Sequence, residues 1–130
     1  MPYRILIADD HSLVRKVLKT TLENSGWHVC AQATNGLEAV QKAAELRPDL
    51  IILDFSMPLM DGLEAARRIL SASPGVPVLM FTNYYCPTLV EEADLAGVRQ
   101  VIDKGLAGHE LVFAVETMLN DKGRTAAASA

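Results

Sequence analysis

One stretch of the sequence decides the fold: Asp49-Leu50-Ile51-Ile52-Leu53-Asp54-Phe55-Ser56-Met57-Pro58-Leu59-Met60-Asp61-Gly62. Its four consecutive aliphatic residues, Leu50 to Leu53, predict a short strand that is buried on both faces of a parallel sheet. Asp54 follows at once, so its carboxylate is expected where the strand leaves the core, and a charge there needs a partner or a function. Met57-Pro58 and Asp61-Gly62 then predict a turn and the start of a helix.

The rest of the chain repeats this alternation of strand and helix. Further strands are expected at residues 3–8, 27–34, 76–81 and 98–102. Asn35 and Asp61, each followed three residues later by Glu, predict helix starts, and Pro87 suits the first turn of another helix with a thin apolar face. Ser12 is the expected cap of the first helix, whose apolar residues recur at helical spacing, namely Leu13, Val14, Val17, Leu18 and Leu22. Five alternations predict an α/β fold, a doubly wound five-stranded parallel sheet with helices on both faces.

The composition limits the class of protein. With 130 residues, half of them hydrophobic, the chain is long enough for one domain with a real core. The net charge of −4 argues against direct nucleic-acid binding by this domain. No apolar run could span a bilayer and the N-terminus does not resemble a signal peptide, so we expect a cytoplasmic protein without a membrane partner. Cys30 and Cys86 are too few for a disulfide framework or a metal cluster. The domain is expected over residues 1–120, with 121–130 as a flexible tail or the start of a linker.

Four of the five predicted strands end in a chemically functional group. Asp9 and Asp10, then Asp54, Thr82 and Lys104 occupy these ends, which meet at one edge of a parallel sheet, where such sheets bind ligands. Crowded carboxylates repel one another, and a hard cation with oxygen ligands, such as Mg²⁺, relieves the repulsion. Lys104 and Thr82 could hold the oxygens of a phosphoryl group. We therefore predict that Asp54 attacks a phosphoryl donor and becomes an aspartyl phosphate.

These strand-end residues, together with Met57-Pro58-Leu59-Met60-Asp61-Gly62, resemble the receiver domains of response regulators in two-component signalling. The resemblance covers residues 3 to about 120 and implies a flavodoxin-like sheet with strand order 2-1-3-4-5. It also implies that Asp54 takes its phosphoryl group from a sensor histidine kinase. Asp10 and Asp54 would bind Mg²⁺ directly with the Ser56 carbonyl, Asp9 would act mostly through water, and Thr82 and Lys104 would hold the phosphoryl group.

The sequence departs from the family pattern near the predicted switch. Val101 stands three residues before Lys104, where the family usually has an aromatic ring that swings on phosphorylation. Asn83 and Gly105 also differ from the usual residues. We therefore expect Thr82, Tyr84 and Tyr85 to carry the signal, through the start of the helix at Pro87, to a surface formed by that helix, strand 98–102 and the last helix.

The resulting hypothesis is a phosphorylation-activated switch that catalyses its own phosphorylation and dephosphorylation and is otherwise not an enzyme. Its output would be an attached domain, first of all a transcriptional one, or a downstream protein, and phosphorylation could produce a homodimer. The alternatives are a stand-alone receiver that acts as a phosphate shuttle or sink, a receiver that binds partners without phosphate, and an aspartyl-phosphate phosphotransferase or hydrolase. Enzymes of this last class that are of the haloacid-dehalogenase type need a second acid two residues after the nucleophile, and that position is Ser56. A flavin carrier of this fold would need a phosphate-binding loop where Asp9-Asp10-His11 would repel one.

Overall fold

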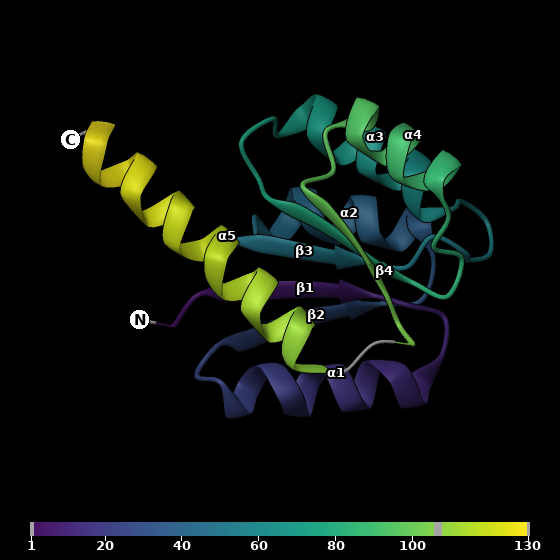
Figure 1. Cartoon of the computed structure of the whole chain (residues 1–130), viewed down its shortest axis with the longest axis horizontal. Coiled ribbons are helices and arrows are strands. Elements are labelled where there is room, and N and C mark those ends of the chain that lie inside the picture. The colour runs from purple at the N-terminus through teal and green to yellow at the C-terminus, as the bar shows by residue number, and fades with distance from the viewer. Residues whose placement is uncertain (1, 106–107, 130) are drawn as a thin grey trace.

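Strands and helices alternate throughout the computed structural model, which describes residues 2–105 and 108–129 (Figure 1). The elements are β1 (Arg4–Ala8), α1 (Ser12–Asn24), β2 (His28–Ala33), α2 (Gly36–Leu46), β3 (Leu50–Leu53), α3 (Gly62–Ala72), β4 (Val78–Thr82), α4 (Pro87–Ala96), β5 (Gln100–Asp103) and α5 (Gly108–Ser129).

All five strands are parallel and lie in the order β2-β1-β3-β4-β5, which confirms the predicted sheet. Helices α1 and α5 cover one face, and α2, α3 and α4 cover the other (Figure 1). Because the strands are parallel, their carboxyl ends lie at one edge of the sheet. Within the described part of the chain, no helix has the length and apolar character needed to cross a membrane.

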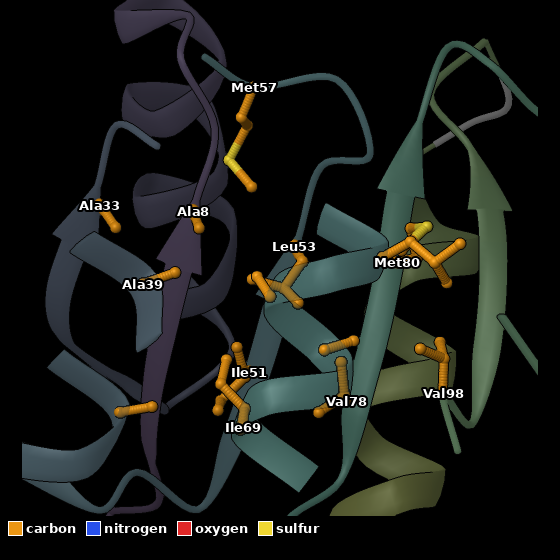
Figure 2. Close-up of a cluster of buried hydrophobic side chains, with 14 of the residues drawn as sticks. Ala8, Ala33, Ala39, Ile51, Leu53, Met57, Ile69, Val78, Met80 and Val98 are labelled. Atoms are coloured by element: carbon orange, nitrogen blue, oxygen red, sulfur yellow. The ribbon is translucent and has the colours of Figure 1, made fainter. Parts of the chain in front are cut away.

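Strand β3 is buried on both faces, as its aliphatic run predicts. Ile51 and Leu53 belong to the core between the sheet and α2, α3 and α4, which Figure 2 shows in close-up. Leu50 and Ile52 belong to the second core, under α1 and α5. All four side chains are at most 1% exposed. The strand that carries Asp54 is therefore fixed from both sides.

The starts of α2 and α3 enclose the loop that follows Asp54. Asn35 and Asp61 are the predicted caps, and each accepts a hydrogen bond of 2.8 Å from the amide three residues on. The Gly36 amide donates to the Met60 carbonyl (3.1 Å), and the Gly62 amide donates to the Phe55 carbonyl (2.7 Å). A Cβ on Gly36 would lie 2.2 Å from the Met60 carbonyl oxygen, and one on Gly62 would lie 2.0 Å from that of Asp54. Only glycine permits these approaches.

Helix α1 differs from the prediction in two ways. Its N-cap is His11, not Ser12, which is already the first helical residue. The expected apolar face is also narrower, because Leu13 and Val17 are 71% and 57% exposed. Inward positions recur every four residues at Val14, Leu18 and Leu22, and Leu13 and Val17 lie beside this row.

Strand β2 contains a β-bulge at Cys30. Val29 pairs with Ile5, but the next pair is Ala31 with Leu6, so Cys30 is an extra residue. The bulge changes the face on which the following side chains lie. Val29 packs into the core under α1, and Ala31 packs against the opposite core. Gln32, which pairs with Ile7, is consequently on the α1 face. Cys30 and Cys86 are both free, as expected.

Helix α5 continues to Ser129, beyond the predicted end of the domain at residue 120. The division into a domain and a flexible tail or linker from residue 121 stays a prediction. Residues 121–129 contain no proline, and Ala126 to Ala128 are strong helix formers. A helix needs no apolar periodicity to continue from a packed segment, and the prediction relied on that periodicity. Ala130 lies outside the described residues.

Candidate functional site

Main-chain hydrogen bonds fix the residues that follow the strands. The Asp9 amide donates to the Ala33 carbonyl (3.0 Å), the Asp54 amide to the Ala8 carbonyl (2.9 Å), and the Lys104 amide to the Thr82 carbonyl (2.9 Å). These bonds link neighbouring strands just beyond their ends. They place the side chains of three different strands at the same edge of the sheet.

Lys104 bridges two buried carboxylates at this edge. Its Nζ lies 2.5 Å from Asp9 Oδ2 and 3.1 Å from Asp54 Oδ2. The three side chains are only 8%, 2% and 4% exposed, in the order Lys104, Asp9, Asp54. Burial lowers the pKa of Lys104, but its hydrogen bond to Asp9 and the charge of Asp54 outweigh burial, so the pKa lies above its ordinary value. Lys104 therefore remains a charged ammonium group.

The environment of the Asp54 carboxyl group disfavours its charged form. Burial raises its pKa, the Lys104 charge lowers it and the Asp9 charge raises it, and the net result lies above the ordinary value. Its Oδ1 atom is buried and has no hydrogen-bond partner within residues 2–105 and 108–129. Buried oxygens without a partner are rare in proteins, so this atom is a candidate to accept a hydrogen bond or to bind a cation.

Four side chains at the site offer ligand atoms to a cation. Atoms of Asp9, Asp10, His11 and Asp54 all lie within 4.8 Å of one another. Asp10 is at the surface, and His11 Nδ1 lies 3.1 Å from Asp10 Oδ1 and 3.3 Å from Asp9 Oδ1. Carboxylate oxygens with access to water suit Mg²⁺, and Asp54 contributes an oxygen that has no hydrogen-bond partner among the described residues. The acidic cluster therefore fits the expected cofactor. Ser56, whose carbonyl was expected to contribute, is half-buried in the loop after Asp54.

The predicted switch residues lie beside the site. Thr82 is fully buried, and its hydroxyl accepts a hydrogen bond from the Tyr84 amide (3.1 Å). Tyr84 is 59% exposed, and its ring meets that of Phe55 edge to face, with centroids 6.2 Å apart and planes at 62°. Tyr85 and Val101 line one pocket formed with residues of α4, β5 and α5.

Comparison with known protein families agrees with this architecture. Residues 5–116 match the family model described as the response regulator receiver domain. The chain is a response regulator receiver domain.

Similar receiver domains occur alone and within longer proteins. The chain is 35% identical over 115 residues to the chemotaxis protein CheY of Thermotoga maritima, covering 88% of this chain and 96% of that protein. It is 37% identical over 116 residues to the transcriptional regulatory protein LnrK of Bacillus subtilis, covering 88% of this chain and 53% of that protein.

Solved structures show the same fold. A LuxR-family two-component response regulator from Aurantimonas sp. SI85-9A1 is 30% identical, with a TM-score of 0.89 over 93% of this chain and 87% of that one. CheY in the CheX–CheY–BeF3–Mg complex of Borrelia burgdorferi is 27% identical, with a TM-score of 0.87 over 90% and 89% of the two chains.

Three residues near the receiver site were not found from the sequence. Phe55 contacts Tyr84. Arg15 donates hydrogen bonds to the Gln32 side chain and to the Asp9 main-chain carbonyl. Phe55 could have been suspected because it follows Asp54. The link from Arg15 to Gln32 depends on the bulge in β2, for which the sequence carries no signal that we recognise.

Proposed function

We propose that this receiver domain is a phosphorylation-activated switch in which Asp54 accepts a phosphoryl group from a sensor histidine kinase, in a Mg²⁺-dependent reaction. One observation supports this most strongly. Lys104 holds one oxygen of Asp54, and the other oxygen of the same buried carboxylate has no partner among the described residues. A carboxylate held in this way is oriented for reaction.

The transfer forms a bond between an Asp54 oxygen and phosphorus while the phosphorus–nitrogen bond to the kinase histidine breaks. Asp10, Asp54 and the Ser56 carbonyl would hold Mg²⁺ directly, and Asp9 would hold it through water. The bound ion would neutralise negative charge on the phosphoryl and carboxylate oxygens. The Lys104 ammonium group neutralises a further phosphoryl oxygen, and the Thr82 hydroxyl donates a hydrogen bond to another. The domain would also catalyse the loss of its own phosphoryl group.

Tyr84 and Tyr85 are proposed to pass the signal to the surface of α4, β5 and α5. Val101 has no ring that could move, whereas the Tyr84 amide is already bonded to Thr82. A shift of Thr82 toward a phosphorylated Asp54 would therefore pull on the start of α4. That helix buries only Leu89 and Ala93, so it can move at small cost.

The receiver would use this surface to control an output domain, first of all a transcriptional one, or a separate downstream protein. A transcriptional output is suggested by the name of the relative LnrK, and a separate partner by the chemotaxis relatives. The cytoplasmic location and a homodimer on phosphorylation belong to the same proposal.

Intact mass after incubation with acetyl phosphate and Mg²⁺ tests the phosphorylation site. We expect one added phosphoryl group in the wild type, none in Asp54→Asn, and wild-type labelling in Asp94→Asn, which removes an exposed acid on α4. Labelling of Asp54→Asn to the wild-type level would refute the assignment. Omission of Mg²⁺ should abolish labelling, and its persistence would refute the metal requirement.

A further inference from the structure

Arg15 connects helix α1 to the loop that carries Asp9 and Asp10. Its Nη1 atom donates a hydrogen bond of 2.7 Å to the main-chain carbonyl of Asp9. This carbonyl belongs to the peptide group that joins Asp9 to Asp10. The hydrogen bond therefore fixes the orientation of that peptide group, and with it the direction of the Asp10 side chain. Charged donors form strong hydrogen bonds, and Arg15 is half-buried, which limits competition from water.

Gln32 holds Arg15 in this position. Its Oε1 atom accepts a hydrogen bond of 3.2 Å from Arg15 Nε. Gln32 can do so because the bulge at Cys30 places it on the α1 face of β2. Its main-chain carbonyl accepts a hydrogen bond from Lys42, which also pairs with Glu38 at 3.0 Å on α2. Gln32 is thus held from both sides of the sheet.

We propose that Arg15 and Gln32 are positioning residues of the receiver site, which orient the Asp9–Asp10 peptide and thereby set the affinity for Mg²⁺. The inference rests on the proposed function, because Asp10 is assigned there as a metal ligand. Neither side chain touches the reacting atoms. Both residues act on the site through the hydrogen bond from Arg15 to the Asp9 carbonyl. The bulge at Cys30 directs the Gln32 side chain toward Arg15, and bulges beside active sites commonly redirect a side chain.

Electrostatics alone predicts the opposite result. Arg15 is a cation hydrogen-bonded to the main chain between Asp9 and Asp10, so removing its charge should strengthen the binding of another cation at the site. Loss of positioning should instead weaken Mg²⁺ binding, by about tenfold as for other groups that orient metal ligands. Gln32→Leu separates the two effects further, because this variant keeps the Arg15 charge and removes its anchor.

The test is an NMR titration of the metal-free protein with Mg²⁺, following the amide of Asp10. Wild type is compared with Arg15→Met, Arg15→Lys and Gln32→Leu, and with Lys16→Met as the control for loss of one charge on an exposed part of α1. Arg15→Met and Gln32→Leu should raise the Kd for Mg²⁺ about tenfold. Arg15→Lys should recover part of the affinity, and Lys16→Met should bind as wild type does or more tightly. In the metal-free wild type the Arg15 Nε–H resonance should exchange slowly, and Gln32→Leu should speed its exchange.

Unchanged or tighter Mg²⁺ binding in Arg15→Met, with the wild-type Arg15 Nε–H signal protected, would overturn the inference and leave the proposed function standing. If Arg15→Met does not fold, Gln32→Leu decides in the same way. Failure of the wild type to bind Mg²⁺ and to be labelled on Asp54 would instead overturn both proposals.

Discussion

Replacing Lys104 by methionine removes the ammonium group that lies between Asp9 and Asp54. Methionine keeps much of the aliphatic volume, so the main loss is the positive charge. At an effective dielectric constant of about 20, unit charges 3.1 Å apart attract by roughly 5 kcal/mol. Removal of one partner from a buried ion pair costs about 3–5 kcal/mol in proteins.

Protonation limits this loss. An aspartate can escape an unfavourable site by taking up a proton, which at pH 7 costs about 4 kcal/mol for a group with an ordinary pKa near 3.9. We therefore expect Lys104→Met to lower the free energy of unfolding by about 3–4 kcal/mol at pH 7 without Mg²⁺. For comparison, Arg68→Met breaks an exposed pair with Glu64 at 3.3 Å and should cost only about 0.5 kcal/mol.

The pH dependence follows from the sign of the shift. The pKa of Asp54 is raised in the folded protein, so protonated Asp54 favours the fold below the unfolded pKa, and this stability is lost as the pH rises through the folded pKa. Without Lys104 that folded pKa rises further. The deficit of Lys104→Met should therefore be largest near neutral pH and shrink toward pH 4. Mg²⁺ at a concentration of about ten times its Kd should raise the free energy of unfolding by about 1.4 kcal/mol. Urea denaturation across this range measures all three effects. A deficit below about 1 kcal/mol at pH 7, or one that does not shrink with acid, would contradict the reasoning.

Three further predictions concern single residues. Asp54→Asn should stabilise the Mg²⁺-free protein at pH 7, because the raised pKa shows that the charged form is disfavoured there, and Mg²⁺ should stabilise only the wild type; urea denaturation that finds the variant less stable would contradict this. Tyr84→Ala should cost about 1 kcal/mol through its contact with Phe55, and it should reduce the amide shifts that beryllium fluoride causes at residues 83–90; shifts of wild-type size would exclude this route. Gly62→Ala should cost about 3 kcal/mol in urea denaturation, and it should slow labelling of Asp54 because it displaces the strand end.

The sheet, and the meeting of the strand-end residues at one of its edges, could be predicted because they depend on local signals. An aliphatic run that ends in a charged residue marks both a buried strand and its carboxyl end, and parallel topology brings such ends together. The caps Asn35 and Asp61 were equally local. For this reason Asp9, Asp54 and Lys104 were found from the sequence, although up to 95 positions separate them along the chain.

Features that depend on register or on packing between elements could not be predicted. Helical spacing includes the exposed flank of α1 as well as its inward row, so the spacing alone did not separate Leu13 and Val17, which are exposed, from Val14, Leu18 and Leu22. One extra residue at Cys30 decides which way Gln32 points, and without it the link to Arg15 would not form. The contact between Phe55 and Tyr84 joins two loops whose approach is set by the fold as a whole.

The close approaches at Gly36 and Gly62 restrict how this domain can be re-engineered. The segment from Phe55 to Asp61 is an attractive place for exchanging loops between receivers, since it adjoins Asp54, the proposed phosphoacceptor. Its main chain, however, is in close contact with Gly36 and Gly62, the first residues of α2 and α3. A transplanted loop would have to keep the same carbonyl positions at residues 55 and 60, or be exchanged together with both helix starts. The exchangeable unit is therefore residues 35–62 as a whole.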